Sequence, residues 1–343
     1  MIGPLSLSPT LHLPTNLLLA PLERVSYVAF RALCHSNGAS MTYTEMIRAK
    51  SITAKLPVIS MIDTIDPQTP TGLQLSVADP DELRACLHAL STGPAHYQNI
   101  STIDINLGCP KPEVVKIGCG PAMLASPDKI SALFSSLREL KDSGILPNLS
   151  AISAKIRLGL DAREVEQKVY LPVLDAAVRH LDFLTVHPRH ASLSVHQQPP
   201  NYSALKEMCA IAKSADLKII GNADITSRAT LERMLETGVD GAMIGRGAIN
   251  NPWLFRHLAD PTIVDGEWPT LQEVDEAEAF HVEWEGRCEG IKNKYVTFRE
   301  VNFRRLRHFV NTGEMLNVTR NKEINNAKKK ALSQRRNAIE NLL

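Results

Sequence analysis

Three segments in the middle of the chain set the fold: TIDINLG (residues 102–108), SPDKISALFSSLRELKDSG (126–144) and AISAKIRLG (151–159). The first and third are short apolar runs that end in polar residues and a glycine, as buried strands do. The middle segment has the length of a helix, begins with a serine and ends in a glycine, which are common helix boundaries. The order strand, helix, strand predicts a parallel sheet.

The same unit recurs along the chain, with helix-like stretches such as DPDELRACLHAL and SRATLERMLETG between the apolar runs. The eight strand candidates are NLLLAP (16–21), SMTYTE (40–45), TGLQLSV (71–77), TIDINLG (102–108), AISAKIRLG (151–159), FLTVHPR (183–189), KIIGNADI (218–225) and GAMIGRGA (241–248). Eight repeats predict an α/β fold of the (β/α)8 TIM-barrel type. A doubly wound sheet also alternates, but it often carries GxGxxG after its first strand, which NLLLAPLERVS lacks.

Composition indicates a globular protein with reduced thiols. The chain has 343 residues and is 44% hydrophobic, enough for a sizeable core. None of its six cysteines lies in a CxxC pair, so we expect neither a disulfide framework nor a metal site. The N-terminal MIGPLSLSPTLHLPTN lacks the basic flank of a signal peptide, and no segment reaches the roughly 20 apolar residues of a membrane span. We therefore expect a soluble, cytoplasmic protein without a membrane partner.

The pattern changes after Pro252. WLFRHLADPTIVDGEWPTLQE reads as a connector punctuated by Pro and Gly, and the sequence beyond it reads as helix without strand candidates. We therefore expect a barrel domain over residues 1–255, a connector over 256–272 and a smaller all-helical domain over 273–343.

The helical domain is strongly basic although the whole chain carries a formal charge of only +1. From Lys292 to the end there are thirteen Lys and Arg residues against four Glu. A charge run is usually no more than a solvated helix face. In FRRLRHF, however, the cations Arg304, Arg305 and Arg307 alternate with apolar residues at helical spacing. Such an amphipathic, cationic helix suits a phosphate backbone, so these three arginines are candidate nucleic-acid contacts.

Polar residues gather where the predicted strands end, which in a TIM barrel is the active-site face. They are Gln74, Asn106, Cys109, Lys155, Arg157, His187, Arg189, Asn222, Asp224 and Arg246. So many polar groups are costly to bury without a polar ligand, and their charges favour an anion. The glycines of GNADI (221–225) and IGRGAINNP (244–252) let the backbone approach a phosphate, with a short helix expected after Gly247.

Three of these residues each have an ordinary structural interpretation beside a functional one. Lys155 is either an interior lysine paired with a carboxylate or a cation that holds the pyrimidine edge of a flavin. His187 is a core histidine, a cofactor ligand or a proton carrier. A lone cysteine such as Cys109 usually serves packing, but at the rim of a flavin site a protonated thiol can donate a proton. Cys119 lies on the same loop and offers an internal comparison.

At these residues the sequence resembles the tRNA-dihydrouridine synthase family, from about Leu17 to Phe255 and more weakly in the helical tail. The motifs that carry the resemblance are LAP with VSYVAFR, TYTEM, GLQL, DINLGCPKP with GCGPAML, KIRLG, VHPR, GNADI and IGRGAINNPWLF. The combination of NLGCP, GPAML and KIRLG is specific to this family among flavin barrels.

The resemblance implies an FMN enzyme that takes a hydride from NADPH, reduces a uracil of tRNA at C6 and protonates C5 from a cysteine, which Cys109 matches. Asn106 and Arg157 match positions near the target base, and the helical domain matches the part that holds tRNA. The FMN contacts carry over to Pro21, Leu22, Glu23, Gln74, Lys155, His187, Asn222, Ala223, Asp224, Gly245 and Arg246. With tRNA as partner and no protein partner evident, we expect a monomer.

The chain departs from the family pattern at three places. Leu22, Glu23 and Arg24 stand where methionine and glycine are usual. Pro188 with His190, and Ala223, stand in the sixth and seventh motifs where a glycine is usual. Two alternatives therefore stay open: a dihydroorotate dehydrogenase-like enzyme acting on a free pyrimidine, and a catalytically weakened tRNA-binding homologue. Binding of tRNA that weakens steeply with added salt would argue against the free-pyrimidine enzyme. A purified protein without flavin absorption would favour the weakened tRNA-binding homologue.

Overall fold

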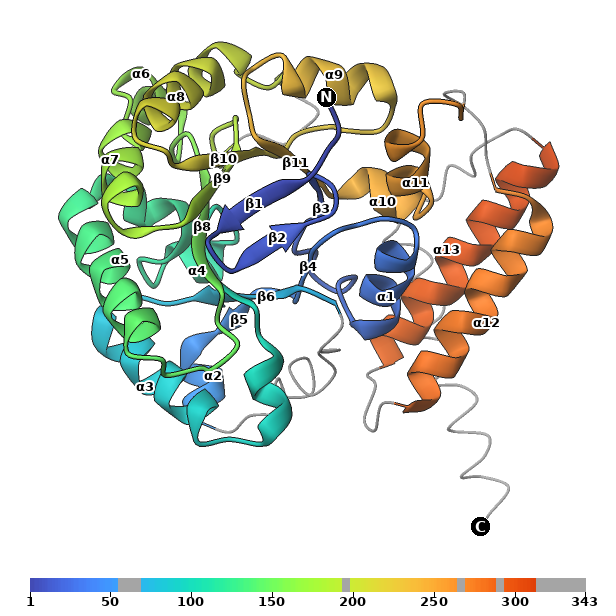
Figure 1. Ribbon diagram of the computed structural model, residues 1–343, viewed down its shortest axis with the longest axis horizontal. Coiled ribbons are helices and arrows are strands. Elements are labelled where there is room, and N and C mark those ends of the chain that lie inside the picture. The colour runs from blue at the N-terminus through green and yellow to red at the C-terminus, as the bar shows by residue number, and fades with distance from the viewer. Residues whose placement is uncertain (55–68, 193–197, 264–268, 288–292, 313–343) are drawn as a thin grey trace. The chain divides into compact units, whose positions relative to one another are not determined.

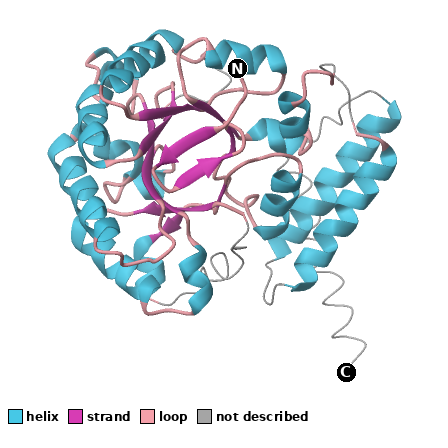
Figure 2. Ribbon diagram, viewed as in Figure 1, coloured by secondary structure: helices cyan, strands magenta, loops and turns pink. Residues whose placement is uncertain are grey.

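The computed structural model describes residues 1–54, 69–192, 198–263, 269–287 and 293–312. The chain divides into two compact units, Met1–Glu267 and Trp268–Leu343. In the first unit the strands lie inside a surround of helices, as Figure 2 shows by colour. This is the layering expected when parallel strands are connected by helices.

Eight parallel strands of the described residues form the barrel (Figure 1). Their order around the sheet is β3-β11-β10-β9-β8-β7-β6-β4, and a parallel bridge from Leu18 to Met41 joins β3 to β4. The bounds are β3 Leu17–Leu19, β4 Thr42–Tyr43, β6 Thr71–Ser76, β7 Thr102–Leu107, β8 Ala151–Arg157, β9 Phe183–His187, β10 Lys218–Gly221 and β11 Gly241–Ile244. Each lies within one of the eight predicted segments, so the predicted TIM barrel is confirmed. A further short strand, β5 (Ile47–Arg48), pairs with β6.

Helices of the first unit connect these strands. They are α1 Val28–Ser36, α2 Ala49–Thr53, α3 Pro80–Ser91, α4 Pro112–Val115, α5 Pro127–Asp142, α6 Ala162–Glu166, α7 Tyr170–His180, α8 Tyr202–Ser214, α9 Arg228–Leu235, α10 Arg246–Asn250 and α11 Leu254–Ala259, with short 3-10 turns at Ala95–Asn99 and Gly120–Ala125. Local sequence explains several starts. Asp79 accepts a hydrogen bond from the Glu82 N–H ahead of α3, and Ser227 forms a capping box with Thr230 at α9.

Strand register sets which side chains meet inside the barrel. On β8 the polar Ser153, Lys155 and Arg157 alternate with apolar residues, and every second residue of a strand faces the same side. Asp104 pairs in register with both Gln74 on β6 and Ser153 on β8. One layer higher, Asn106 pairs with Lys155, and higher still Arg157 pairs with His187. The register therefore stacks polar residues toward the carboxyl ends of the strands.

An N-terminal hairpin, which the sequence analysis did not predict, packs against the barrel core. Strands β1 (Leu5–Ser8) and β2 (Leu11–Leu13) are antiparallel, and in Figure 1 they cross the ring of strands. Their leucines cluster with buried residues of the barrel strands, including Phe183 and Met243. The Ser8 hydroxyl also donates to the Ser150 carbonyl oxygen just before β8, at 2.7 Å. This hairpin adds apolar residues to the core of the barrel.

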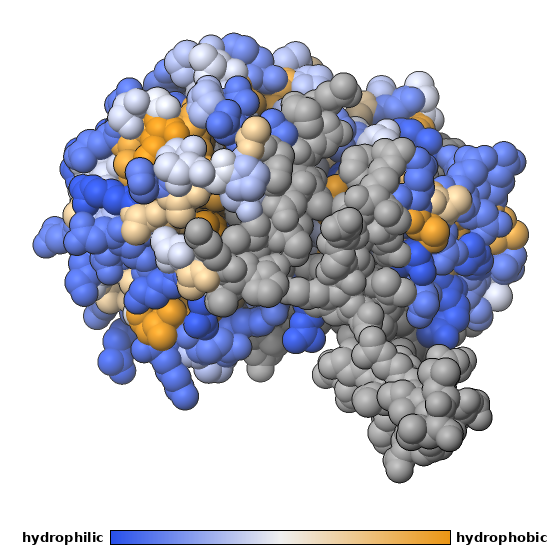
Figure 3. All heavy atoms as spheres, turned by 90° about the horizontal axis from the view of Figure 1, so that it is seen from below, coloured by the Kyte–Doolittle hydropathy of each residue, from blue (hydrophilic) through white to orange (hydrophobic). Residues whose placement is uncertain are grey.

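The described part of the second unit consists of two helices, α12 (Leu271–Arg287) and α13 (Asn293–Thr312). They pair antiparallel: the rings of His281 and Phe303 pack edge-on with their centroids 5.2 Å apart, and Arg307, later on α13, contacts Asp275, earlier on α12. Neither these helices nor any other described helix has the length and apolarity that crossing a bilayer demands. On the face in Figure 3 most described residues are hydrophilic, and the hydrophobic ones form small groups.

Candidate functional site

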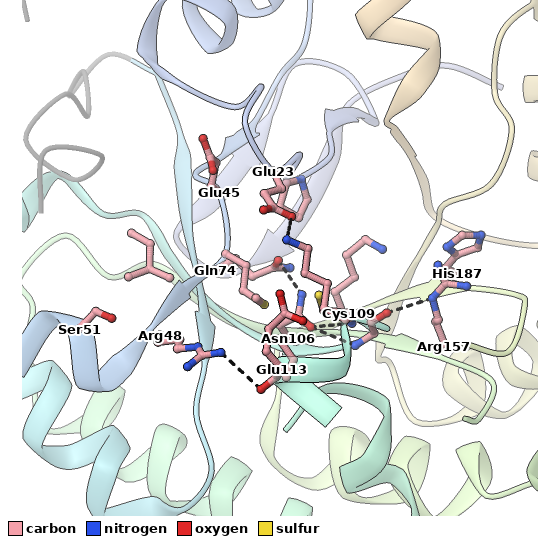
Figure 4. Close-up of a pocket in the computed structure, with 17 residues that line it drawn as sticks. Glu23, Glu45, Arg48, Ser51, Gln74, Asn106, Cys109, Glu113, Arg157 and His187 are labelled. Carbon is pink, nitrogen blue, oxygen red and sulfur yellow. Dashed lines mark hydrogen bonds and ion pairs between the residues drawn. The ribbon is translucent and has the colours of Figure 1, made fainter. Parts of the chain in front are cut away.

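A pocket of about 430 Å³ opens at the carboxyl ends of the strands. Figure 4 shows side chains from the ends of β6, β7, β8 and β9 and from the loops beside them pointing into it. Eight of the predicted site residues line this one pocket: Pro21, Glu23, Gln74, Asn106, Cys109, Lys155, Arg157 and His187. Segments far apart in the sequence thus supply a common site.

A chain of side-chain hydrogen bonds runs from the barrel interior to the Cys109 loop. Asp104 accepts from Gln74 Nε2 at 2.7 Å and from the Ser153 hydroxyl at 2.6 Å. The oxygen of the Gln74 amide accepts from Asn106 Nδ2 at 2.8 Å. The oxygen of the Asn106 amide then accepts the backbone N–H of Cys109 at 2.9 Å. Because each amide has one donor end and one acceptor end, Asp104 fixes the orientation of both.

Burial shifts the charge balance at the floor of the pocket. It raises the pKa of Asp104 to about 6, although its hydrogen bonds from Ser153 and Gln74 and the charge of Lys155 oppose this. Burial and the neighbouring Arg157 lower the pKa of Lys155 to about 8. A lysine with this pKa still carries its charge at neutral pH. Lys155 therefore offers a half-buried cation at the pocket that can bind a polar ligand.

Further cations surround His187. Arg157 donates from Nε to the Gly108 carbonyl oxygen at 3.0 Å and from Nη1 to the His190 carbonyl oxygen at 3.0 Å, which aims its guanidinium along the pocket wall. Burial and the charges of Arg157, Lys155, Arg189 and Arg246 hold the pKa of His187 well below its usual range. The imidazole is therefore neutral at pH 7 and can act as a hydrogen-bonding group.

Cys109 is half-buried and borders the pocket, whereas Cys119 on the same loop is buried. Burial raises the pKa of the Cys109 thiol, and this outweighs the backbone N–H of Lys111 and the nearby cations, which favour the thiolate. The thiol is thus protonated at neutral pH. Gly120 has a φ of +63°, and a Cβ there would lie 2.8 Å from the Cys109 carbonyl oxygen. The GCGP segment can pack against Cys109 because it carries glycine there.

The loop after β3 reaches the loop after β7 through an ion pair between Glu23 and Lys111, drawn as a dashed line in Figure 4. Glu23 also lies 3.9 Å from the guanidinium of Arg24. Both Glu23 and Lys111 border the pocket, so the pair forms part of its rim.

The remaining predicted cofactor residues do not border this pocket. Asp224 binds the guanidiniums of Arg189 and Arg246; burial alone would raise the pKa of Asp224, but these two cations hold it below its usual range. The Asn222 side chain donates to the Met243 carbonyl oxygen at 2.7 Å, and Ala223 is buried. These groups lie at the ends of β10 and β11, on the far side of His187 from Cys109.

The loop after β11 differs slightly from the expectation. Helix α10 starts at Arg246, directly after Gly245, and not after Gly247. A Cβ on Gly247 would lie 2.2 Å from the Ile225 carbonyl oxygen, so this glycine serves close packing between the last two loops. A Cβ on Gly245 would come within 3.5 Å of Leu22, which places the first motif beside the eighth.

The three candidate arginines of the helical domain lie on α13. Arg307 contacts Asp275 at 2.6 Å and Glu278 at 2.5 Å, so much of its charge is already compensated. Arg304 is exposed, and Arg305 is half-buried. The cations after residue 312 lie outside the described residues. Each unit is described by itself, so these arginines are not placed relative to the pocket.

Comparison with known proteins agrees with the motifs. The dihydrouridine synthase family model matches residues 18–340. The chain belongs to the dihydrouridine synthase family. It is 32% identical over 248 residues to a probable tRNA-dihydrouridine synthase of Aquifex aeolicus, covering 71% of this chain and 73% of that one. It is 31% identical over 253 residues to tRNA-dihydrouridine synthase B of Pectobacterium carotovorum, covering 72% of each chain.

A solved structure shares the fold of this dihydrouridine synthase family member. It is an asparagine-to-alanine mutant of morphinone reductase in complex with tetrahydroNAD, with a TM-score of 0.50 and 14% identity. The match covers 76% of this chain and 92% of that one. At this identity the likeness supports the barrel architecture alone.

Sequence reasoning missed several residues of the site. Asp104 lies in an apolar run and was not singled out, although its position two residues before Asn106 puts it on the same face of the strand. Lys111 borders the pocket from a loop, Arg48 from the two-residue strand β5 and Glu113 from the four-residue helix α4, segments too short for a periodic pattern to mark them. Among the residues that the structure describes, no three His, Cys, Asp or Glu side chains are grouped so as to hold a metal ion.

The departures from the family pattern have visible geometry. Arg24 has a φ of +61°, and Asp224, which follows the departure at Ala223, has a φ of +42°, a region that glycine adopts more readily than other residues. His190 is buried, and its carbonyl oxygen accepts from Arg157. The unusual loop around Pro188 and His190 thus still supports a pocket residue through its backbone.

Proposed function

We propose that this protein is a tRNA-dihydrouridine synthase that uses FMN and NADPH to convert a uridine of tRNA to 5,6-dihydrouridine. One observation carries the proposal. In a chain of this family, a protonated thiol, two amides and two half-buried cations from β6, β7 and β8 and the loop after β7 converge on a single pocket. Family membership alone does not imply an intact site, whereas this convergence supports a working one.

The residues of the pocket fit FMN. Lys155 is a half-buried cation that borders the pocket together with the amides of Gln74 and Asn106, and the charge of Asp104 acts on it. These groups would hold the polar pyrimidine edge of the flavin. Arg246 and the backbone at Gly245 would hold its phosphate, with Asn222, Ala223 and Asp224 shaping that end and Pro21, Leu22 and Glu23 covering the ring.

FMN, when bound, would supply the hydride chemistry that links NADPH to C6 of the uracil. Lys155 and the neighbouring Arg157 would place positive charge beside the pyrimidine edge of the flavin. His187, held neutral by its cationic neighbours, would donate or accept a hydrogen bond without adding further charge.

The Cys109 thiol would donate the proton to C5 of the uracil. Hydride addition at C6 leaves negative charge on the ring at C5, and the S–H bond breaks as the C5–H bond forms, leaving a thiolate. Asn106 would position the thiol, because its amide oxygen accepts the Cys109 N–H while its Nδ2 donates to the Gln74 amide oxygen. Arg157, whose Nε donates to the Gly108 carbonyl oxygen next to Cys109, would contact the base or its phosphate from the same side of the pocket.

A uracil within folded tRNA must be unstacked before it can enter this pocket. The basic helical domain over residues 273–343 would bind the tRNA backbone for this step, with Arg304, Arg305 and Arg307 contributing from α13. The barrel over residues 1–255 would then act as the catalytic domain, joined through residues 256–272. We propose that the protein acts as a monomer.

The test is to incubate the purified protein with NADPH and unmodified tRNA and to map dihydrouridine by mass spectrometry. We expect product from the wild type and a loss of at least about 100-fold in rate for Cys109→Ala, since general acids contribute rate factors of this size. Cys119→Ala is the matched control, because it removes a thiol from the same loop at a buried position; it should retain activity. Equal yields from Cys109→Ala and wild type would remove Cys109 from the mechanism.

A further inference from the structure

The rim of the pocket contains an ion pair whose position suggests a role in the proposed reaction. Glu23 follows β3 and Lys111 follows β7, and these strands are separated in the ring by β4 and β6. The pair therefore spans part of the pocket mouth and ties two loops that no strand pairing connects. Lys111 is also only two residues from Cys109, so the loop tied by this pair is the one that carries the thiol.

The ion pair between Glu23 and Lys111 should contribute little to the stability of the fold. The side chains of Lys111 and Glu23 are 38% and 48% exposed, and pairs this accessible to water contribute little to the free energy of folding. Its effect is instead local. Lys111 favours the Cys109 thiolate and Glu23 opposes it, so the two charges act on the thiol in opposite directions.

The other charged groups near the thiol do not provide this balance. Arg157 on β8 favours the thiolate, as Lys111 does, and Cys109 in turn interacts with the charge of Lys155. Among the groups that act on Cys109, Glu23 is the carboxylate that offsets these cations. Glu113 on α4 and Arg48 on β5 border the same pocket, and Arg48 donates a hydrogen bond to the Glu113 backbone carbonyl oxygen.

We propose that Glu23 and Lys111 are a positioning pair, which holds the Cys109 loop beside the loop after β3 and balances the charge next to the thiol. The inference rests on the proposed function, in which Cys109 must remain protonated until the uracil ring needs a proton. Glu23 is one of the residues at which the chain departs from the family pattern, so this device belongs to this chain.

The test measures the alkylation rate of Cys109 by iodoacetamide in the full-length protein as isolated, between pH 6 and pH 10, with the Cys109 peptide quantified by mass spectrometry. Glu23→Gln leaves Lys111 uncompensated and should speed alkylation at pH 8 by about threefold, the effect of half a pKa unit on the thiolate fraction. Lys111→Gln should slow it by a similar factor. The double variant E23K/K111E restores the pair and should return to within about twofold of the wild-type rate.

Two controls separate the pair from general charge effects. Arg24→Gln removes the cation 3.9 Å from the same Glu23 carboxylate, and Lys116→Gln removes a cation from the same loop away from the pocket. Both should stay within about twofold of wild type. The proposal is overturned if neither single variant changes the alkylation rate, or if E23K/K111E, which restores the ion pair, does not return the rate to within about twofold of wild type. Dihydrouridine formation is assayed on the same preparations, so failure of the proposed function would be seen separately.

Discussion

At the scale of single residues, Asp104 shows how the site is assembled from the interior outward. It is 1% exposed and lies one layer below the pocket, where it receives hydrogen bonds from Gln74 and Ser153. A buried carboxylate is unfavourable unless it is well hydrogen-bonded or near a cation, and Asp104 has both kinds of partner. Asp104 orients the amides of Gln74 and Asn106 above it, which an aliphatic residue cannot do because it accepts no hydrogen bond.

Asp104→Asn should change how stability depends on pH. Burial raises the folded-state pKa of Asp104 to about 6 from an unfolded value near 3.8. The stability that comes from the raised pKa is therefore fully present below the unfolded value and is lost as the pH rises through 6. Between pH 4 and pH 7 the free energy of unfolding of the wild type should fall by on the order of 2 kcal/mol more than that of the variant. Urea unfolding at both pH values measures this, and a constant difference between the two proteins would contradict it.

At the scale of elements, strand and helix order could be predicted because each barrel strand is a short apolar run between polar ends. The N-terminal hairpin was missed for a different reason. Leu5, Leu7, Leu11 and Leu13 alternate with polar residues around the turn SPT, which is a period-two hairpin signal, but the two strands are only four and three residues long and the signal is correspondingly weak. Pocket residues on loops, such as Lys111, could not be predicted because their neighbours come from distant segments.

The hairpin should contribute measurably to the stability of the barrel. Leu7 on β1 is 2% exposed and belongs to the core cluster that includes barrel strands. Leu7→Ala should therefore lower the free energy of unfolding by about 2–4 kcal/mol, through lost burial and the cavity left behind. The matched control is Ile211→Ala on α8, where the side chain is 41% exposed and the change should stay within about 0.5 kcal/mol. A loss below about 1 kcal/mol for Leu7→Ala would mean that the hairpin packs only weakly.

At the scale of the whole molecule, the near-neutral total charge conceals a basic C-terminal segment. Its cations fall into two groups that the sequence alone could not separate. Arg307 is compensated by Asp275 and Glu278 across the helix pair, a contact that depends on how α12 and α13 pair. The run KKK at residues 328–330 has no acidic residue closer than Glu323 in the sequence. The second group should therefore contribute more free charge to tRNA binding.

This difference predicts a specific salt dependence. Each phosphate contact contributes about 0.7–0.9 to the slope of log affinity against log salt, because a bound counterion is released. Replacing Lys328, Lys329 and Lys330 by Gln should reduce the slope for tRNA by about 2, if these lysines reach the backbone. Arg307→Gln should change the slope by less than about 1, because its charge is already engaged. Filter binding at salt concentrations from about 50 to about 300 mM measures both slopes. A wild-type affinity that does not vary with salt would instead favour an enzyme acting on a free pyrimidine.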